Sequence, residues 1–120
     1  MNPSIEHALA NDRIIDITTV GRKTGEARRI EIWFHRIDGR YYITGTPGAR
    51  SWYANLVANP NFTFHLKEST QADLAAVATP VEGIRKDRIL KAIEASLASS
   101  NLTLDAQTSP LVEVTWVNAT

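Results

Sequence analysis

The stretch from residue 13 to residue 46, RIIDITTVGRKTGEARRIEIWFHRIDGRYYITGT, decides the fold. Its first part, residues 13–20, is rich in Ile, Thr and Val, the β-branched types that suit a pleated, half-buried surface. Residues 27–37 place Ile30, Ile32 and Phe34 on one face of a second strand, and the Asp-Gly pair that follows is a strong hairpin signal leading into residues 40–46. The stretch therefore predicts three consecutive antiparallel strands.

The rest of the chain adds short strands and helices in no regular alternation. Strands are expected over 61–67, 72–81 and 111–117, and helices over 4–10, from Ser51 to the Asn-Pro pair at 59–60, and over 84–99. This order argues against a parallel dinucleotide-binding fold. It predicts one domain over residues 1–120, mainly β (α+β), with about six antiparallel strands curled into a small barrel and two or three helices.

Two details of the predicted helices concern individual side chains. Ser51 stands where the short helix begins, and a Ser hydroxyl there is a good N-cap. In the last helix Ile89 and Ile93 share one face, and Lys86 is expected to point away from it.

Composition narrows the classes of function. The 120 residues are 43% hydrophobic and 22% charged, which is typical of a globular domain. The sequence contains no Cys, which excludes thiol nucleophiles and thiolate metal sites, and its three His lack metal-ligand spacing. No apolar run reaches the roughly 18 residues of a membrane span and no signal peptide is visible, so we expect a cytoplasmic protein.

Positive charge is concentrated in one part of a neutral chain. Residues 21–50 carry a net charge of +4, although the whole sequence has a net charge of zero. Nucleic-acid binders usually carry a basic surplus over the entire domain, so this clustering favours a compact anionic ligand. A barrel that binds single-stranded nucleic acid is an alternative, and the sequence pI of about 6.8 weighs against it.

The basic turn at residues 21–26 is the first candidate anion site. Arg22, Lys23 and Thr24 lie between two Gly residues, whose backbone N–H groups are accessible to an anion. In the following strand Arg28 and Arg29 alternate faces, so one of them should point to the same side as the turn. The plain alternative is a solvated hairpin tip.

The start of the short helix is the second candidate anion site. Arg50 directly precedes Ser51, and a helix N-terminus offers unpaired N–H groups and the positive end of the dipole. In a meander the ends of the first and third strands can lie on one rim, so both candidate sites could hold one elongated anion. The plain alternative is an ordinary capped helix.

Two motifs together resemble a known family. Residues 18–34, TTVGRKTGEARRIEIWF, and residues 48–60, GARSWYANLVANP, are similar to the deazaflavin-dependent nitroreductase and quinone reductase family, split β-barrel proteins that use coenzyme F420. The resemblance is strong over roughly residues 13–67. It implies hydride transfer from the reduced cofactor to a small organic acceptor, such as a quinone, a nitro compound or an activated alkene.

The resemblance also implies where the cofactor binds. In that family the basic turn and the loop into the short helix hold the phosphodiester and the oligoglutamate tail of F420. Carried over by position, the cofactor-binding residues are Arg22, Lys23, Thr24, Arg28, Gly48, Ala49, Arg50 and Trp52. No catalytic side chain is expected, because the cofactor carries the hydride chemistry.

Related split barrels leave alternatives open. FMN is the alternative cofactor, because the wider superfamily contains FMN-binding oxidases. A carrier that binds F420 or flavin without turnover is a further alternative. Split barrels often pair, so a homodimer is a reasonable hypothesis, and the expected partner is otherwise a small-molecule electron acceptor.

Overall fold

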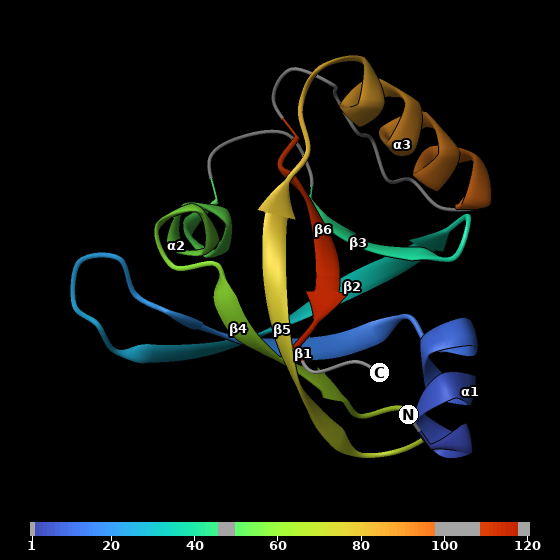
Figure 1. Ribbon diagram of the computed structural model, residues 1–120, viewed down its shortest axis with the longest axis horizontal. Helices are drawn as coiled ribbons and strands as arrows, with labels where there is room; N and C mark the ends of the chain where they lie inside the picture. Colours follow the sequence, from blue (N-terminus) through green and yellow to red (C-terminus); the bar gives the residue numbers. More distant parts are fainter. Residues whose placement is uncertain (1, 46–49, 98–108, 118–120) are drawn as a thin grey trace.

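A computed structural model describes residues 2–45, 50–97 and 109–117 of the chain. Six antiparallel strands form a closed barrel in the order β1-β2-β3-β6-β5-β4, and three helices lie around it (Figure 1). The elements are α1 (Pro3–Asn11), β1 (Ile14–Val20), β2 (Ala27–Ile37), β3 (Arg40–Thr44), α2 (Ser51–Ala58), β4 (Asn61–Leu66), β5 (Ala72–Pro80), α3 (Gly83–Ser96) and β6 (Leu111–Trp116). The predicted mainly β barrel is confirmed, and residues 46, 98 and 99 of the expected elements lie outside the described ranges.

Alternate residues of the strands fill the barrel with apolar side chains. Ile15 and Ile17 of β1 are fully buried, as is Phe64 of β4. The Phe64 ring packs edge-on against Phe34 of β2, with 5.2 Å between ring centroids, and against Trp116 of β6 at 5.0 Å. Burying each such side chain stabilises the fold by about 2 kcal/mol. The interior cluster therefore fixes which face of each strand points inward.

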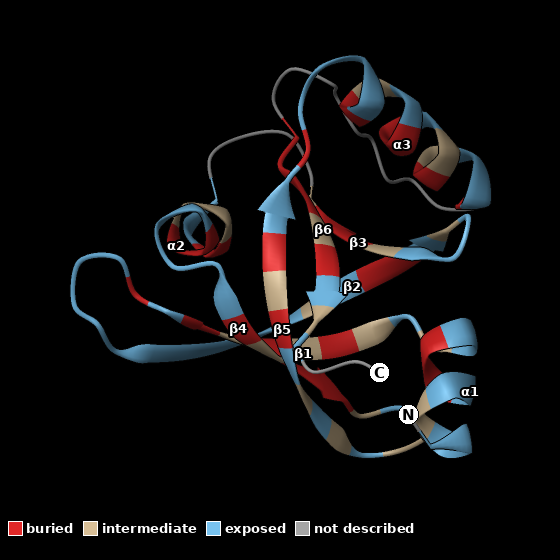
Figure 2. Cartoon of the chain, in the orientation of Figure 1, coloured by how far each residue is buried: buried red, intermediate tan, exposed pale blue. Residues whose placement is uncertain are grey.

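A second apolar cluster lies between α3 and the barrel wall. Ile89, Leu90 and Ile93 of α3 pack over Tyr42 of β3, and the inward face of α3 is buried in Figure 2. The expectation for Lys86 was wrong, because this side chain is 6% exposed and lies on the buried face of α3. Its position three and four residues before Ile89 and Leu90 puts its aliphatic stem over the cluster, which leaves only the amine to reach outward.

The turn between β2 and β3 forms as the Asp-Gly pair predicts. Asp38 has φ of 52° and Gly39 has φ of 77°, the left-handed values that a tight two-residue hairpin turn requires at both central positions. This turn sets the register in which His35 lies opposite Tyr42.

β2 changes partners along its length, and this creates the site described below. Residues 27–33 of β2 pair with β1, whereas residues 34–37 pair with β3. β1 in turn pairs with β4 only over Ile15–Thr18. The outer half of the β1–β2 hairpin therefore extends beyond the barrel wall, and α2 lies beside it (Figure 1).

Candidate anion-binding site

Backbone hydrogen bonds close the turn between β1 and β2 on itself. The N–H of Gly21 donates to the carbonyl of Glu26 at 2.8 Å, and the N–H of Gly25 donates to the carbonyl of Gly21 at 2.9 Å. The Thr24 hydroxyl accepts from the N–H of Glu26 at 3.2 Å. A Cβ atom on Gly21 would lie 2.8 Å from Thr24 Oγ1, so only Gly fits at this position without displacing the Thr24 side chain.

The pleat of β2 sends its two adjacent guanidinium groups to opposite faces. Arg28 lies opposite Thr19 of β1, which is 2% exposed, so both side chains are on the face that turns toward the barrel interior. Arg29 is on the outer face, where its Nε donates to Asp16 Oδ2 at 3.0 Å. Arg28 is therefore the member of this pair that faces the turn.

The start of α2 differs from the sequence expectation. Ser51 is the first residue inside the helix, the N-cap is Arg50, and no side chain makes a capping hydrogen bond. The prediction of a Ser51 cap was wrong by one position: the hydroxyl of a residue already in helical conformation does not lie in front of the second and third N–H groups. The exposed Ser51 instead lines a pocket together with residues of the turn between β1 and β2.

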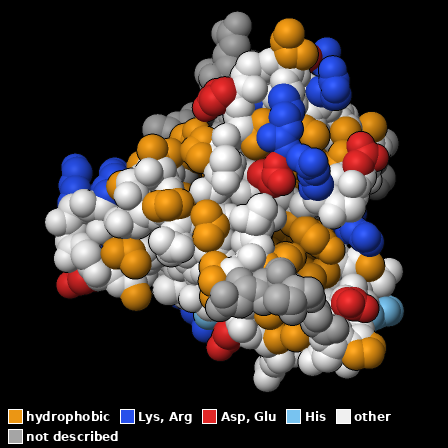
Figure 3. All heavy atoms as spheres, viewed as in Figure 1, with side chains coloured by type: hydrophobic (Ala, Val, Ile, Leu, Met, Phe, Trp, Pro, Cys, Tyr) orange, Lys and Arg blue, Asp and Glu red, His pale blue; other side chains and the backbone are white. Residues whose placement is uncertain are grey.

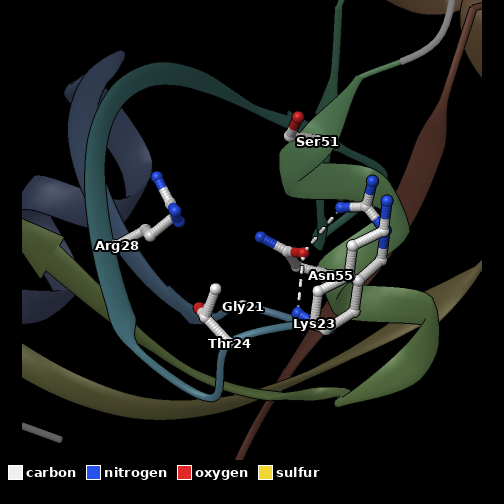
Figure 4. Close-up of a pocket in the computed structure, with 7 residues that line it drawn as sticks. Gly21, Lys23, Thr24, Arg28, Ser51 and Asn55 are labelled. Carbon is white, nitrogen blue, oxygen red and sulfur yellow. Dashed lines mark hydrogen bonds between the residues drawn. The ribbon is translucent and has the colours of Figure 1, made fainter.

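Asn55 joins α2 to the turn. Its Oδ1 accepts from the backbone N–H of Arg22 at 3.1 Å and from Arg22 Nη1 at 2.9 Å. Its Nδ2 donates to Thr19 Oγ1 at 3.4 Å, and the whole residue is 3% exposed. Figure 4 shows Asn55 pointing from α2 toward the turn, with two hydrogen bonds of its side chain dashed. Two segments far apart in the sequence are thus held together.

These segments enclose a pocket of about 270 Å³. Its described lining residues are Gly21, Arg22, Lys23, Thr24, Arg28, Ser51 and Asn55 (Figure 4). Three of them are cations and none is an acid. Lys and Arg side chains also gather at this end of the molecule in Figure 3, at the left. The pocket offers guanidinium, ammonium, hydroxyl and amide groups to one ligand, a donor set suited to phosphate or carboxylate.

The structure brings together half of the residues predicted to bind the cofactor. Arg22, Lys23, Thr24 and Arg28 line the pocket. Arg50 is exposed at the N-cap of α2, next to the pocket, and is not among its described lining residues. Residues 48 and 49, predicted as Gly48 and Ala49 contacts, lie outside the described ranges.

Trp52 and Asn55 differ from the predicted set of pocket residues. Trp52 is 8% exposed, packs in the barrel core and is not among the described lining residues of the pocket, so its contact with the cofactor stays a prediction. Asn55 was missed, although a signal existed: it lies one helical turn after Ser51, and residues four apart share a helix face.

Two other features, a metal site and a membrane-spanning helix, are not found in the described part of the chain. Over residues 2–45, 50–97 and 109–117, no group of three or more His, Cys, Asp or Glu side chains is placed to hold a metal ion. No described helix has both the length and the apolar character needed to cross a membrane.

The closed six-stranded barrel places the chain in the split-barrel class of folds, and comparisons with known proteins agree. The sequence model of the F420H(2)-dependent quinone reductase family matches residues 2–115. The chain belongs to this family, whose members are F420-dependent oxidoreductases.

Solved structures share the fold at low sequence identity. One described as an F420 reductase is 16% identical, with a TM-score of 0.71 over 93% of this chain and 92% of that chain. One described as a domain-swapped dimer is 22% identical, with a TM-score of 0.63 over 87% of this chain and 81% of that chain. The heme storage protein HutZ from Vibrio cholerae is 17% identical, with a TM-score of 0.65 over 98% of this chain and 91% of that chain. The fold alone therefore does not select the ligand.

Proposed function

We propose that this chain binds coenzyme F420 with its anionic part in the pocket between the β1–β2 turn and α2, and reduces a small quinone. Family membership supports F420 as the cofactor. The observation that carries the assignment of the site is that Arg22 and Lys23 of the β1–β2 turn and Arg28 of β2 line one pocket. Three cations around one pocket fit a phosphodiester or glutamate carboxylates, and they exceed what a single neutral ligand would use.

The face of the hairpin that carries Arg28 also fits the rest of such a ligand. Ile30 lies two residues further along β2 on the same face, opposite Ile17, and is 37% exposed. The face therefore runs from a cation at the turn to an apolar side chain toward the barrel. This order matches an amphipathic molecule with an anionic tail and a flat, largely apolar ring system.

The reaction asks little of the side chains themselves. When bound, reduced F420 supplies a hydride, and a quinone that takes up this hydride and one proton becomes a hydroquinone. The pocket residues bind and orient the cofactor, and the hairpin face restricts how its ring lies against the barrel. We therefore assign cofactor-binding roles to Arg22, Lys23, Thr24 and Arg28 and no proton-transfer role.

Steady-state kinetics tests this function. Oxidation of reduced F420 is followed by absorbance with a soluble benzoquinone, and in parallel with an aromatic nitro compound and with an activated alkene. Turnover with the quinone that exceeds turnover with the other two acceptors supports the proposal. Tight F420 binding without turnover on any acceptor would instead make the chain a carrier.

We also infer that the chain forms a homodimer, as one solved structure with this fold is described as a domain-swapped dimer. Light scattering measures this directly, because a dimer has twice the 13.3 kDa mass of the chain. A single species of monomer mass would overturn the inference.

A further inference from the structure

We propose that Asn55 is a positioning residue that fixes the Arg22 guanidinium at the pocket while leaving its positive charge available to the anionic part of the ligand. The inference rests on the proposed function, since it concerns how the same pocket binds its ligand. It adds a role for a residue that acts through Arg22.

The hydrogen bonds around Asn55 leave its amide only one orientation. Both groups of Arg22 that approach it are donors, the backbone N–H at 3.1 Å and Nη1 at 2.9 Å, so the atom facing them must be the amide oxygen. The amide nitrogen then points to Thr19 Oγ1 at 3.4 Å. Asn55 and Thr19 are 3% and 2% exposed, so water does not compete for these bonds. The amide thus holds both the backbone and the side chain of Arg22.

Other cations of this protein are held in a different way. On the outer face of the barrel Arg29 bonds to Asp16, and Lys67 contacts Asp16 at 2.7 Å. Arg85 of α3 pairs with Glu113. Each of these three cations is fixed by a carboxylate, whose negative charge offsets the positive charge around it.

Arg22 is fixed by a neutral amide instead. Among the ion pairs found over residues 2–45, 50–97 and 109–117, none involves Arg22. An amide oxygen supplies the same acceptor geometry as a carboxylate oxygen without a negative charge. The pocket therefore keeps a positioned guanidinium whose full charge acts on the ligand, and the ordering of this long side chain does not have to occur upon binding.

Two substitutions separate positioning from charge. Asn55→Ala removes both hydrogen bonds between Asn55 and Arg22 but leaves the positive charge of Arg22. Arg22 then becomes mobile, and affinity for F420 should fall about fivefold. Asn55→Asp keeps acceptor oxygens for Arg22 but neutralises it, so affinity should fall further, about thirtyfold. The F420 affinity of Asn55→Asp should also depend less steeply on salt than that of the wild type, because one fewer charge attracts the ligand. Gln71→Glu in the β4–β5 turn is the matched control, since it makes the same amide-to-acid change at an exposed residue outside this pocket.

The experiment is a fluorescence titration of each protein with F420 at low and high salt, with thermal melting to verify folding. The order wild type, Asn55→Ala, Asn55→Asp in falling affinity, with Gln71→Glu equal to wild type, supports the proposal. Tighter binding by Asn55→Asp than by Asn55→Ala would show that charge preservation is not the role of the amide. Wild-type affinity in Asn55→Ala would eliminate the positioning role.

Two further measurements keep the test decisive. If the Asn55 variants do not fold, Arg22→Ala must lower affinity without a change in melting temperature, and unchanged affinity would overturn the proposal. Calorimetry with inorganic pyrophosphate repeats the series without F420. If the wild type and the two Asn55 variants bind pyrophosphate in the predicted order of affinity but the wild type does not bind F420, the proposed function fails and the role of Asn55 stands. Binding of neither ligand would refute both.

Discussion

Arg28 and Arg29 are neighbours in β2, yet one lines the cationic pocket and the other bonds to Asp16 on the outer face of the barrel. The pKa of Asp16 is held below its ordinary value, first by the hydrogen bond from Lys67 and also by that from Arg29, and burial opposes both effects. Arg29 therefore belongs to an outer ion-pair network. Two identical side chains in adjacent positions thus provide an internal comparison of ligand-binding and surface charge.

Replacing each of these arginines by Ala tests the site. Arg28→Ala should weaken F420 binding about tenfold or more, the effect expected for the loss of a hydrogen bond to a charged group. Arg29→Ala removes the same formal charge from the next residue and should leave affinity within about twofold, because a surface charge outside the pocket is screened. Both affinities are measured by fluorescence titration under one salt condition. Equal losses in the two variants would mean that only net charge matters and that the pocket is not the site.

Ser51 provides a second test, because its hydroxyl makes no capping bond. Ser51→Ala should change the free energy of unfolding by less than about 0.5 kcal/mol, as for an ordinary surface substitution. It should weaken F420 binding severalfold, since Ser51 lines the pocket. Denaturant unfolding and titration measure the two effects.

Asn2 is the matched control for Ser51. Its side-chain oxygen accepts from the N–H of Ile5 at 2.8 Å and caps α1. Asn2→Ala should therefore cost about 1 kcal/mol of stability and leave F420 binding unchanged. A larger stability loss in Ser51→Ala than in Asn2→Ala would restore the capping role to Ser51.

The strands were predictable because local chemistry and tertiary packing agree in them. In β1 fully buried residues alternate with less buried ones as the pleat demands, and Asp38-Gly39 specifies the turn that joins β2 to β3. Helix faces were harder to predict. Lys86 is a cation on a buried face, and only the packing of α3 on Tyr42 shows that its stem is needed there.

The site was predictable in part for a related reason. A cluster of Arg and Lys around two Gly is visible in the sequence. Whether these side chains line a pocket depends on which residues of neighbouring elements lie opposite them. The register of β1 with β2 decides that Arg28 faces inward, and contact with α2 decides that Asn55 reaches Arg22. Neither relationship is local, so neither follows from spacing within one motif.

His35 makes the stability of the barrel depend on pH. Burial, and secondarily the positive charge of Arg13, lowers the pKa of His35 to about 4 from an ordinary value of 6.5. Because the folded state disfavours the protonated form, the unfolded state binds more protons between these two values. The stabilising contribution is complete above pH 6.5 and is lost as pH falls toward 4, to a total of roughly 3 kcal/mol.

Denaturant unfolding between pH 7 and pH 4 measures this contribution. Other groups, including carboxylates, titrate in the same range, so the comparison is with His35→Gln, which has no titratable group at this position. The wild type should lose more stability than the variant between pH 6.5 and pH 4.5. Parallel curves for the two proteins would show that His35 is not the group responsible.

The central claim is that the pocket between the β1–β2 turn and α2 holds the anionic part of F420. Titration of the wild type and Arg28→Ala with F420, beside FMN in the same buffer and salt, tests it most directly. We predict tight F420 binding by the wild type, weak or no binding of FMN, and a loss of F420 affinity in Arg28→Ala. Binding of FMN alone, or F420 affinity unchanged by Arg28→Ala, would contradict the account.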